Sequence, residues 1–265
     1  MIEIPSFNEL IEKSIISNWD KDALTDFKGA TLQYHDVARK IEKLHIMFES
    51  SGVQRGDKIA LCGRNSSNWA VAFLATLTYG AVAVPILHEF TADQIHNIVN
   101  HSEAKLLFVG DYVATIIDQT KMPDLEGIIY IPDYSLVVSR TDKLTYAREH
   151  LNAMFGEKYP KFFRKEHVHY YREQSPEELA LINYTSGTTG FSKGVMIPYR
   201  AMWSNYDFAM TAVAKHIKKG DNVISILPMA HMYGMAFEFL FEYLFGWHVF
   251  YLTRVPSPAI IAAAF

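Results

Sequence analysis

Short strand-like and helix-like stretches alternate along most of this chain, and this order restricts its fold more than any other feature. Apolar residues recur at helical spacing from Val37 to Phe48, a mostly apolar stretch follows at residues 58–62, and another helical stretch begins near Ser67. The same order resumes from Leu179. A parallel strand pair needs a crossover connection, which a helix commonly supplies. We therefore predict an α/β fold, with largely parallel sheets and helices on both faces.

Local signals set several boundaries. Gly52 follows the apolar stripe and is a predicted helix cap, and Thr91 with Gln94 forms a capping box. After a strand at 179–184 and a Gly-rich loop, we expect a helix over about 199–217. Further strands are expected at 23–27, 31–34, 81–84, 105–109, 127–131, 222–227 and 247–252, with helices from residue 7, at 235–244 and at 258–265.

The composition is that of an ordinary globular protein. The chain has 265 residues, of which 49% are hydrophobic and 20% charged, enough for one large domain or two small ones. Its 25 Lys and Arg against 29 Asp and Glu predict no general attraction to nucleic acid. Cys62 is the only cysteine, which excludes an intrachain disulfide and fits a cytoplasmic protein. The composition predicts no oligomeric state, and we identify no metal site.

Residues 69–87 carry no charge and are nearly long enough to span a bilayer. Gly80 and Pro85 interrupt the stretch, however, and it is rich in Ala. We predict a helix that ends near Tyr79, a turn at Gly80 and then a buried strand, because strands covered on both faces read as continuous apolar runs. A membrane span is disfavoured by these helix breakers.

Residues 134–176 interrupt the alternation, and we interpret them as an insertion within the domain. Basic and aromatic residues are interleaved there: Lys158, Lys161, Arg164, Lys165 and Arg172 with Tyr159, Phe162, Phe163, Tyr170 and Tyr171. Such a mixture suits contact with an anionic membrane surface or a nucleic acid. The acidic chain favours the other interpretation, in which the aromatics pack on the domain and the cations face water. Peripheral membrane contact stays open, with nucleic-acid binding not expected.

The strongest functional signal is the segment Tyr184-Thr-Ser-Gly-Thr-Thr-Gly-Phe-Ser-Lys193, which follows an apolar strand. Its glycines let the backbone turn sharply, and exposed N–H groups in such a turn bind anions. The hydroxyls of Thr185, Ser186, Thr188 and Thr189 and the charge of Lys193 add further donors. An ordinary turn between two strands would not need this density of hydroxyls, so we predict a polyphosphate site. The predicted binding residues are Thr185, Ser186, Gly187, Thr188, Thr189, Gly190 and Lys193.

The spacing of this segment differs from that of a Walker A loop. That motif requires a glycine, four residues and then Gly-Lys-Ser or Gly-Lys-Thr. Five residues after Gly187 the chain has Ser192, and Gly194 follows the lysine instead of preceding it. The spacing therefore excludes the Walker A kinase and GTPase classes.

With these residues, the chain resembles the adenylate-forming superfamily, which includes acyl-CoA synthetases, luciferases and peptide-synthetase adenylation domains. The loop is similar to the family's phosphate-binding signature. Four further segments are similar to family blocks and follow the same order: Gly56-Asp-Lys-Ile-Ala-Leu, Asn65-Ser-Ser-Asn-Trp69, Gly80-Ala-Val-Ala-Val-Pro85 and Leu227-Pro-Met-Ala-His-Met-Tyr-Gly234. Ser192 and Tyr199 depart from the family's usual proline and histidine, and neither change removes a phosphate donor.

The resemblance implies a reaction in which a carboxylate attacks the α-phosphate of ATP, pyrophosphate leaves, and coenzyme A then takes the acyl group. ATP, Mg²⁺ and coenzyme A are the implied cofactors and co-substrates. The family's later blocks, including its catalytic lysine, do not occur in this sequence. Residues 1–265 are therefore expected to form an amino-terminal AMP-binding domain that is incomplete at its carboxy end. No complete catalytic set is expected, and we expect the chain to be inactive alone.

His231 has two interpretations. It follows a strand and a turn, at the carboxyl end where open α/β sheets bind ligands, and the resemblance implies that it lines the acyl pocket. Alternatively it caps the next helix or lies in the core. The helix that follows is almost wholly apolar, and Glu238 and Glu242 share one of its faces. It could form the wall of a fatty-acyl tunnel, but we favour a buried helix with one solvent-exposed edge, its wet edge.

The residues around His231 and the long 134–176 segment resemble the branch of the family that contains the medium- and long-chain fatty acid–CoA ligases, so the resemblance implies such an activity. The alternatives are an aryl-CoA ligase, a peptide-synthetase adenylation domain or a non-catalytic nucleotide-binding module. The expected partners are accordingly a fatty acid, ATP and coenzyme A.

Overall fold

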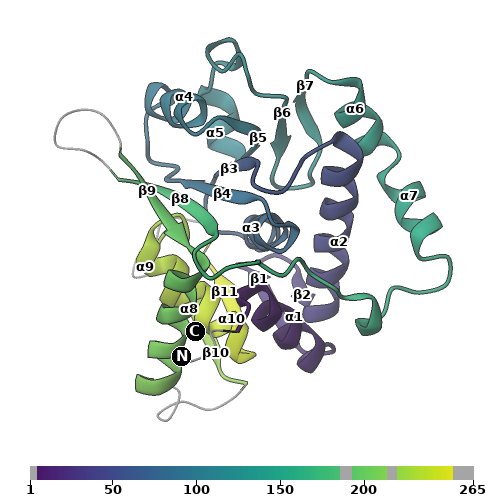
Figure 1. Cartoon of the computed structure of the whole chain (residues 1–265), viewed down its shortest axis with the longest axis vertical. Coiled ribbons are helices and arrows are strands. Elements are labelled where there is room, and N and C mark those ends of the chain that lie inside the picture. Colours follow the sequence, from purple (N-terminus) through teal and green to yellow (C-terminus); the bar gives the residue numbers. More distant parts are fainter. Residues whose placement is uncertain (1–4, 186–192, 214–219, 253–265) are drawn as a thin grey trace.

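In the computed structural model, residues 5–185, 193–213 and 220–252 are described. Two β-sheets lie one beside the other, with helices packed around both (Figure 1). A hydrophobic core joins them, because Leu24 and Val249 of the smaller sheet belong to the same buried cluster as Ile59 and Leu61 of the larger one. The α/β class predicted from the alternation is confirmed.

The larger sheet has seven strands, and its five inner strands are mutually parallel. The edge strands at both ends are antiparallel to their neighbours. In spatial order the strands are β7 (Leu136–Ser139), β6 (Gly127–Tyr130), β5 (Ala104–Val109), β3 (Lys58–Cys62), β4 (Val82–Ile86), β8 (Leu179–Thr185) and β9 (Lys193–Pro198). Strand β4 follows β3 in sequence and lies on one side of it, whereas β5 lies on the other side. The strand order therefore reverses at β3.

Helices cover both faces of this sheet, as predicted. Ile59 and Leu61 of β3 pack in the cluster that contains α2 (Tyr34–Ser51) and α3 (Ser67–Tyr79). The alternate residues, Ala60 and Cys62, pack in a second cluster with α4 (Ala92–His101) and α5 (Asp111–Ile116). This division follows from the strand geometry, in which successive side chains point to opposite faces. A short helix, η1 (Gln119–Lys121), follows α5.

The smaller sheet has the order β10 (Asn222–Ser225), β11 (His248–Tyr251), β1 (Asp22–Asp26) and β2 (Thr31–Gln33). The first three strands are parallel and β2 is antiparallel to β1. The surrounding helices are α1 (Phe7–Ser17), α8 (Tyr199–Ala212), α9 (Met232–Met235), η4 (Ala236–Leu240) and α10 (Phe241–Phe245), of which the last three follow one another without a break.

The uncharged stretch at 69–87 is core, as predicted. Helix α3 ends at Tyr79, Gly80 has φ 85° at the turn, and all five residues of β4 are buried. Only a residue without Cβ adopts this φ easily, which explains the glycine. No helix in the described part of the chain is long and apolar enough to cross a membrane.

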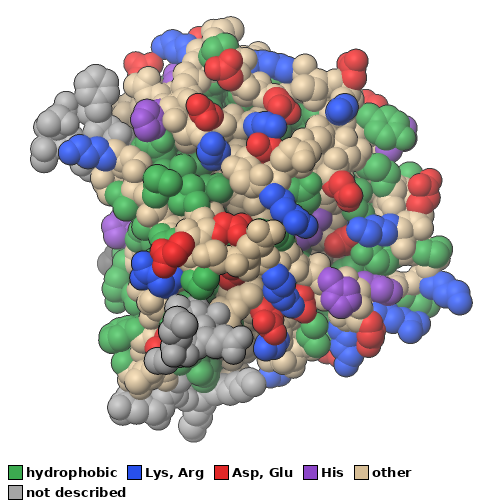
Figure 2. All heavy atoms as spheres, in the orientation of Figure 1, with side chains coloured by type: hydrophobic (Ala, Val, Ile, Leu, Met, Phe, Trp, Pro, Cys, Tyr) green, Lys and Arg blue, Asp and Glu red, His purple; other side chains and the backbone are tan. Residues whose placement is uncertain are grey.

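The 134–176 segment contributes β7, α6 (Asp142–Glu149), α7 (Leu151–Lys158) and η2 (Lys165–His167). Tyr170 is buried, and its backbone N–H donates to Glu12 at 2.9 Å. Phe163 packs on the core, whereas Phe162 is 71% exposed. Figure 2 shows Lys, Arg and His side chains gathered over the part that follows α7. These contacts favour the packing interpretation, and membrane contact stays a prediction.

Two features differ from the sequence prediction. Strand β9 was not expected, because a helix was predicted to follow the Gly-rich loop; instead β9 returns alongside β8 before α8 begins. The helix after His231 begins at Met232 and contains a π-helical stretch, η4. Helix α8 ends at Ala212, and residues 214–217 of the predicted helix, like the helix predicted at 258–265, lie outside the described residues.

Candidate functional site

The Gly-rich segment joins β8 to β9 at the carboxyl end of β8. Thr185 and Lys193 are directly opposite in the antiparallel register, and both are exposed. The two described ends of the predicted phosphate site are therefore brought together. The other predicted binding residues, Ser186, Gly187, Thr188, Thr189 and Gly190, lie outside the described residues.

The base of this hairpin is packed tightly. Tyr184 is 5% exposed, and its hydroxyl lies 2.7 Å from Nδ1 of His101 in α4. A Cβ placed on Gly194 would lie 2.9 Å from Ile182 and 3.0 Å from the Tyr184 ring. Gly194 therefore lets β9 lie close to these side chains, and the base of the loop is held on the sheet.

Two asparagines fasten the 225–231 segment, which carries His231, to the larger sheet. Asn65, just after β3, donates to the carbonyl of Leu227 at 2.7 Å and accepts from the N–H of Met229 at 2.8 Å. Asn183 in β8 donates to the carbonyl of Ala230 at 3.0 Å. Both asparagines are 8% exposed. They bridge the two sheets at the same edge as the hairpin.

Sequence reasoning assigned no role to either asparagine. A signal for Asn183 was present, because it is the one amide within the apolar strand 179–184, and buried amides need hydrogen-bond partners. Asn65 directly follows a buried strand at its carboxyl end, where ligands and loops gather in open α/β sheets. The partners of both lie more than forty residues away in the chain, so the pattern alone could not identify them.

His231 takes the capping position of the two that the sequence left open. Its Nδ1 accepts from the N–H of Tyr233 at 3.2 Å at the start of α9, and the side chain is exposed. Gly234 packs against the backbone of Pro228, because a Cβ on Gly234 would lie 2.5 Å from the carbonyl oxygen of Pro228. A capping role and exposure leave the ring accessible, and its place in an acyl pocket stays a prediction.

The two glutamates of the following helix lie in different surroundings, although the sequence placed them on one face. Glu238 accepts from the backbone N–H groups of Ile226 and Leu227, each at 2.7 Å. Glu242 is only 4% exposed, and its Oε2 has no hydrogen-bond partner among the described residues. Burial, with a smaller contribution from Glu238, raises the pKa of Glu242 to about 7. The expected wet edge therefore does not extend to Glu242.

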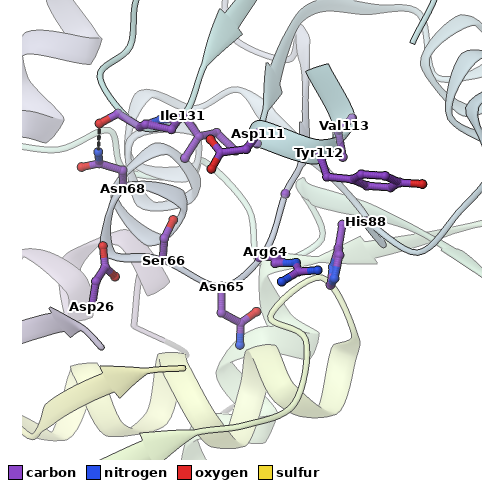
Figure 3. Close-up of a pocket in the computed structure, with 13 residues that line it drawn as sticks. Asp26, Arg64, Asn65, Ser66, Asn68, His88, Asp111, Tyr112, Val113 and Ile131 are labelled. Atoms are coloured by element: carbon purple, nitrogen blue, oxygen red, sulfur yellow. Dashed lines mark hydrogen bonds between the residues drawn. The ribbon is translucent and has the colours of Figure 1, made fainter. Parts of the chain in front are cut away.

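A cavity of about 490 Å³ lies at the carboxyl ends of β3, β5 and β6, where the strand order reverses. Open α/β sheets bind ligands at such a position. Arg64 and His88 lie next to each other at one side of it, and Asp111 and Tyr112 come from the start of α5 (Figure 3). Sequence reasoning did not identify this cavity, because its lining comes from five separate stretches of chain.

The cavity carries a cation at its rim. Arg64 is exposed and forms no ion pair with any residue that the structure describes. Burial lowers the pKa of His88, with Arg64 adding to the effect, whereas Glu89 at 3.3 Å opposes it. The carboxylate of Asp26 binds the amino terminus of α3, where it accepts hydrogen bonds from the backbone N–H and the hydroxyl of Ser67. Within the described ranges, no cluster of three or more His, Cys, Asp or Glu could hold a metal ion.

Comparison with known proteins gives consistent matches. A family model described as "AMP-binding enzyme" matches residues 12–265. The chain is 25% identical over 213 residues to long chain acyl-CoA synthetase 3 of Arabidopsis thaliana, covering 79% of this chain and 32% of that protein. It is 26% identical over 217 residues to 4-chlorobenzoate–CoA ligase of an Arthrobacter species, covering 80% and 36%. It thus spans about a third of the length of these relatives.

The fold is also similar to solved structures. A natural red-emitting luciferase from Phrixothrix hirtus superimposes with a TM-score of 0.82 at 17% identity, covering 99% of this chain and 49% of that chain. At such identity the likeness concerns the fold alone. The family model, by contrast, matches nearly the whole sequence. The chain therefore belongs to the AMP-binding enzyme family, the adenylate-forming acyl- and aryl-CoA ligases, and matches part of the length of such enzymes.

Proposed function

We propose that this chain holds the ATP phosphates in an enzyme that converts a fatty acid to an acyl-adenylate and then to acyl-CoA. The observation that carries the proposal is the β8–β9 hairpin, which presents the Gly-rich segment between Thr185 and Lys193 at the carboxyl end of β8. A packed base with exposed ends suits a loop whose backbone N–H groups must meet an anion.

The residues present fit a polyphosphate. Lys193 supplies a cation, Thr185 supplies a hydroxyl donor, and neither is paired with a carboxylate among the described residues. When bound, ATP supplies the activated phosphoryl centre, usually with Mg²⁺. The task of these side chains is to orient the phosphates and to neutralise charge on their oxygens, which is electrostatic stabilisation and needs no nucleophile of the protein.

We assign the acid substrate to the surroundings of His231. His231 is exposed and precedes the almost wholly apolar helix formed by α9, η4 and α10. This arrangement suits an apolar acid whose carboxylate lies near the imidazole. The name of the Arabidopsis relative supports a long acyl chain, and that of the Arthrobacter relative favours the runner-up, an aryl acid. Arg64 at the cavity rim is our candidate for contact with the phosphates of coenzyme A.

The test separates binding from catalysis. Equilibrium titration of the purified chain with ATP should show weak binding that Lys193→Ala removes and that Lys143→Ala, an exposed lysine on α6, leaves unchanged. Pyrophosphate release with fatty acid and ATP should be absent, since the family's later blocks do not occur in this sequence. Robust release by the chain alone would contradict this part of the proposal. Equal ATP binding by both variants would contradict the assignment of the loop.

A further inference from the structure

A second groove, of about 370 Å³, lies on the side of the molecule formed by α2, α6 and α7, to the right in Figure 1. It has the volume of a small-molecule site. Its charged lining consists of Arg39, Lys40, Lys43 and Arg148 with Asp36 and Asp133. Four cations against two carboxylates leave a net charge of +2, in a chain whose overall charge is −4.

Three of the four cations have only neutral partners among the described residues. Lys43 donates to the amide oxygen of Asn152 at 2.8 Å, and Lys40 to that of Asn68 at 3.3 Å. Arg148 uses its Nε to donate to the carbonyl of Tyr134 at 2.6 Å. Lys43 and Lys40 also lie 5.3 Å and 5.7 Å from the ring centroids of Phe155 and Tyr134. The terminal nitrogens of Arg148 and further N–H donors of both lysines remain for a ligand.

The other three charged groups have partners of their own. Arg39 forms an ion pair with Asp36 at 3.1 Å, and Asp133 accepts from the backbone N–H of Ser135 at 2.9 Å. Neither carboxylate forms an ion pair with Lys43 or Arg148, although Arg148 lies near enough to lower the pKa of Asp133, so the groove keeps its net positive charge. Gathering like charges in a half-buried groove costs free energy, which a bound anion would reverse.

The lysines show this cost. Burial lowers the pKa of Lys43, and the nearby Arg39 and Arg148 lower it further. Burial also lowers the pKa of Lys40, with Lys43 adding to the effect and the carboxylates of Asp36 and Asp26 opposing it. Repulsion of this kind without a compensating ligand is a poor way to stabilise a fold, and it points to a ligand that carries negative charge.

We propose that this groove binds the phosphate group of a small phosphomonoester, held by Lys40, Lys43 and Arg148. A dianionic phosphate matches the net charge of the groove, and its three oxygens match donors that arrive from α2 and α6. Leu32, Leu44 and Leu151 also line the groove and would contact the organic part of the ligand. The proposal is independent of the ATP site, which lies on the β8–β9 hairpin.

The test is equilibrium titration of the chain with inorganic phosphate and with glycerol 3-phosphate, at an ionic strength kept constant with chloride. Saturable binding is expected, weakened about tenfold in Lys43→Gln, because a charge-assisted hydrogen bond is lost. Lys43→Arg should retain most of the affinity. The matched control is Lys13→Gln, which removes the same charge from an exposed position on α1 and should bind like the parent.

A thermal melt separates this role from a structural one. Without phosphate, Lys43→Gln should melt at the same temperature as the parent or higher, since it relieves repulsion and can still donate to Asn152. Phosphate should raise the melting temperature of the parent and not of the variant. Binding that is absent from the parent, or weakened equally in Lys43→Gln and Lys13→Gln, would overturn the proposal, as would a melt in which Lys43→Gln alone collapses.

The phosphate could belong to a soluble metabolite or to a lipid headgroup, and sedimentation with vesicles distinguishes the two. Vesicles of phosphatidate, whose headgroup is a phosphomonoester, would assign the groove to a lipid phosphate if they retain the parent but not Lys43→Gln. Saturable binding of glycerol 3-phosphate without retention on vesicles would assign it to a soluble ligand.

Discussion

Replacing Asn65 tests how the two sheets are joined at the candidate site. Its side chain donates to Leu227 and Ser225 and accepts from Met229, and it is 8% exposed. Asn65→Ala would leave the buried N–H of Met229 without a partner, at a cost of roughly 1–3 kcal/mol. The Leu227 carbonyl is only partly buried and costs less. We expect about 2 kcal/mol in total, or a fall of roughly 4–8 °C in Tm.

The assay is a thermal melt combined with native-state hydrogen exchange at the Met229 amide. The matched control is Asn152→Ala, because Asn152 is exposed and makes a single side-chain contact, so it should cost less than about 0.5 kcal/mol. Asn65→Asp keeps the acceptor for Met229 but turns a carboxylate oxygen toward the Leu227 carbonyl, and should be worse at pH 8 than at pH 4. If Asn65→Ala costs no more than the control and the Met229 amide stays protected, the reasoning is refuted.

Three other perturbations follow from the described contacts. Lys193→Ala, in an enzyme that carries the family's later blocks, should weaken ATP use about 10- to 100-fold, since a charged hydrogen bond contributes roughly 1.5–3 kcal/mol. Its Tm should not change, and Lys193→Arg should restore part of the activity. Unchanged adenylation kinetics would count against a phosphate-binding role for the loop. Gly194→Ala should destabilise by about 1–3 kcal/mol through contact with Ile182, whereas Gly156→Ala, which meets open space, should not, as denaturant melts would show. Glu242 stays protonated to higher pH in the folded state than in the unfolded state, so its contribution to stability is greatest below about pH 4.5 and is lost as pH rises to about 7. The free energy of unfolding should therefore fall by about 3 kcal/mol over this range, and Glu242→Gln should remove that fall. An unaltered pH profile in the variant would refute the assignment.

The periodicity of the sequence was sufficient for most of the larger sheet. Residues 58–62 form β3 as predicted, and α3 runs from Ser67 to Tyr79 with its cap at Gly80. These elements are determined locally, by apolar period, capping residues and a glycine with positive φ. The Thr91–Gln94 capping box is confirmed for the same reason.

Features that depend on pairing or packing between segments could not be predicted in this way. Strand β9, residues 193–198, carries exposed Val195 and Met196, so it lacks the buried alternation that marks a strand. It is held by its pairing with β8, and tertiary pairing of this kind overrides local propensity. The cavity beside Arg64 and the cationic groove along α2 were missed similarly, because each is lined by residues from several distant stretches.

The arrangement of the two asparagines has a consequence for how the site is assembled. Asn65 directly follows β3 and Asn183 lies in β8, both of the larger sheet, whereas residues 225–231 begin at the last residue of β10 in the smaller one. The position of His231 relative to the β8–β9 hairpin therefore depends on hydrogen bonds between the sheets and not on either sheet alone. Asn65 makes contacts on both sides of Pro228, and Asn183 makes one at Ala230, so Asn65 contributes more to holding the segment. Because both act on the same seven residues, their substitutions should be non-additive, and a double-mutant cycle on the Met229 exchange rate would measure that coupling.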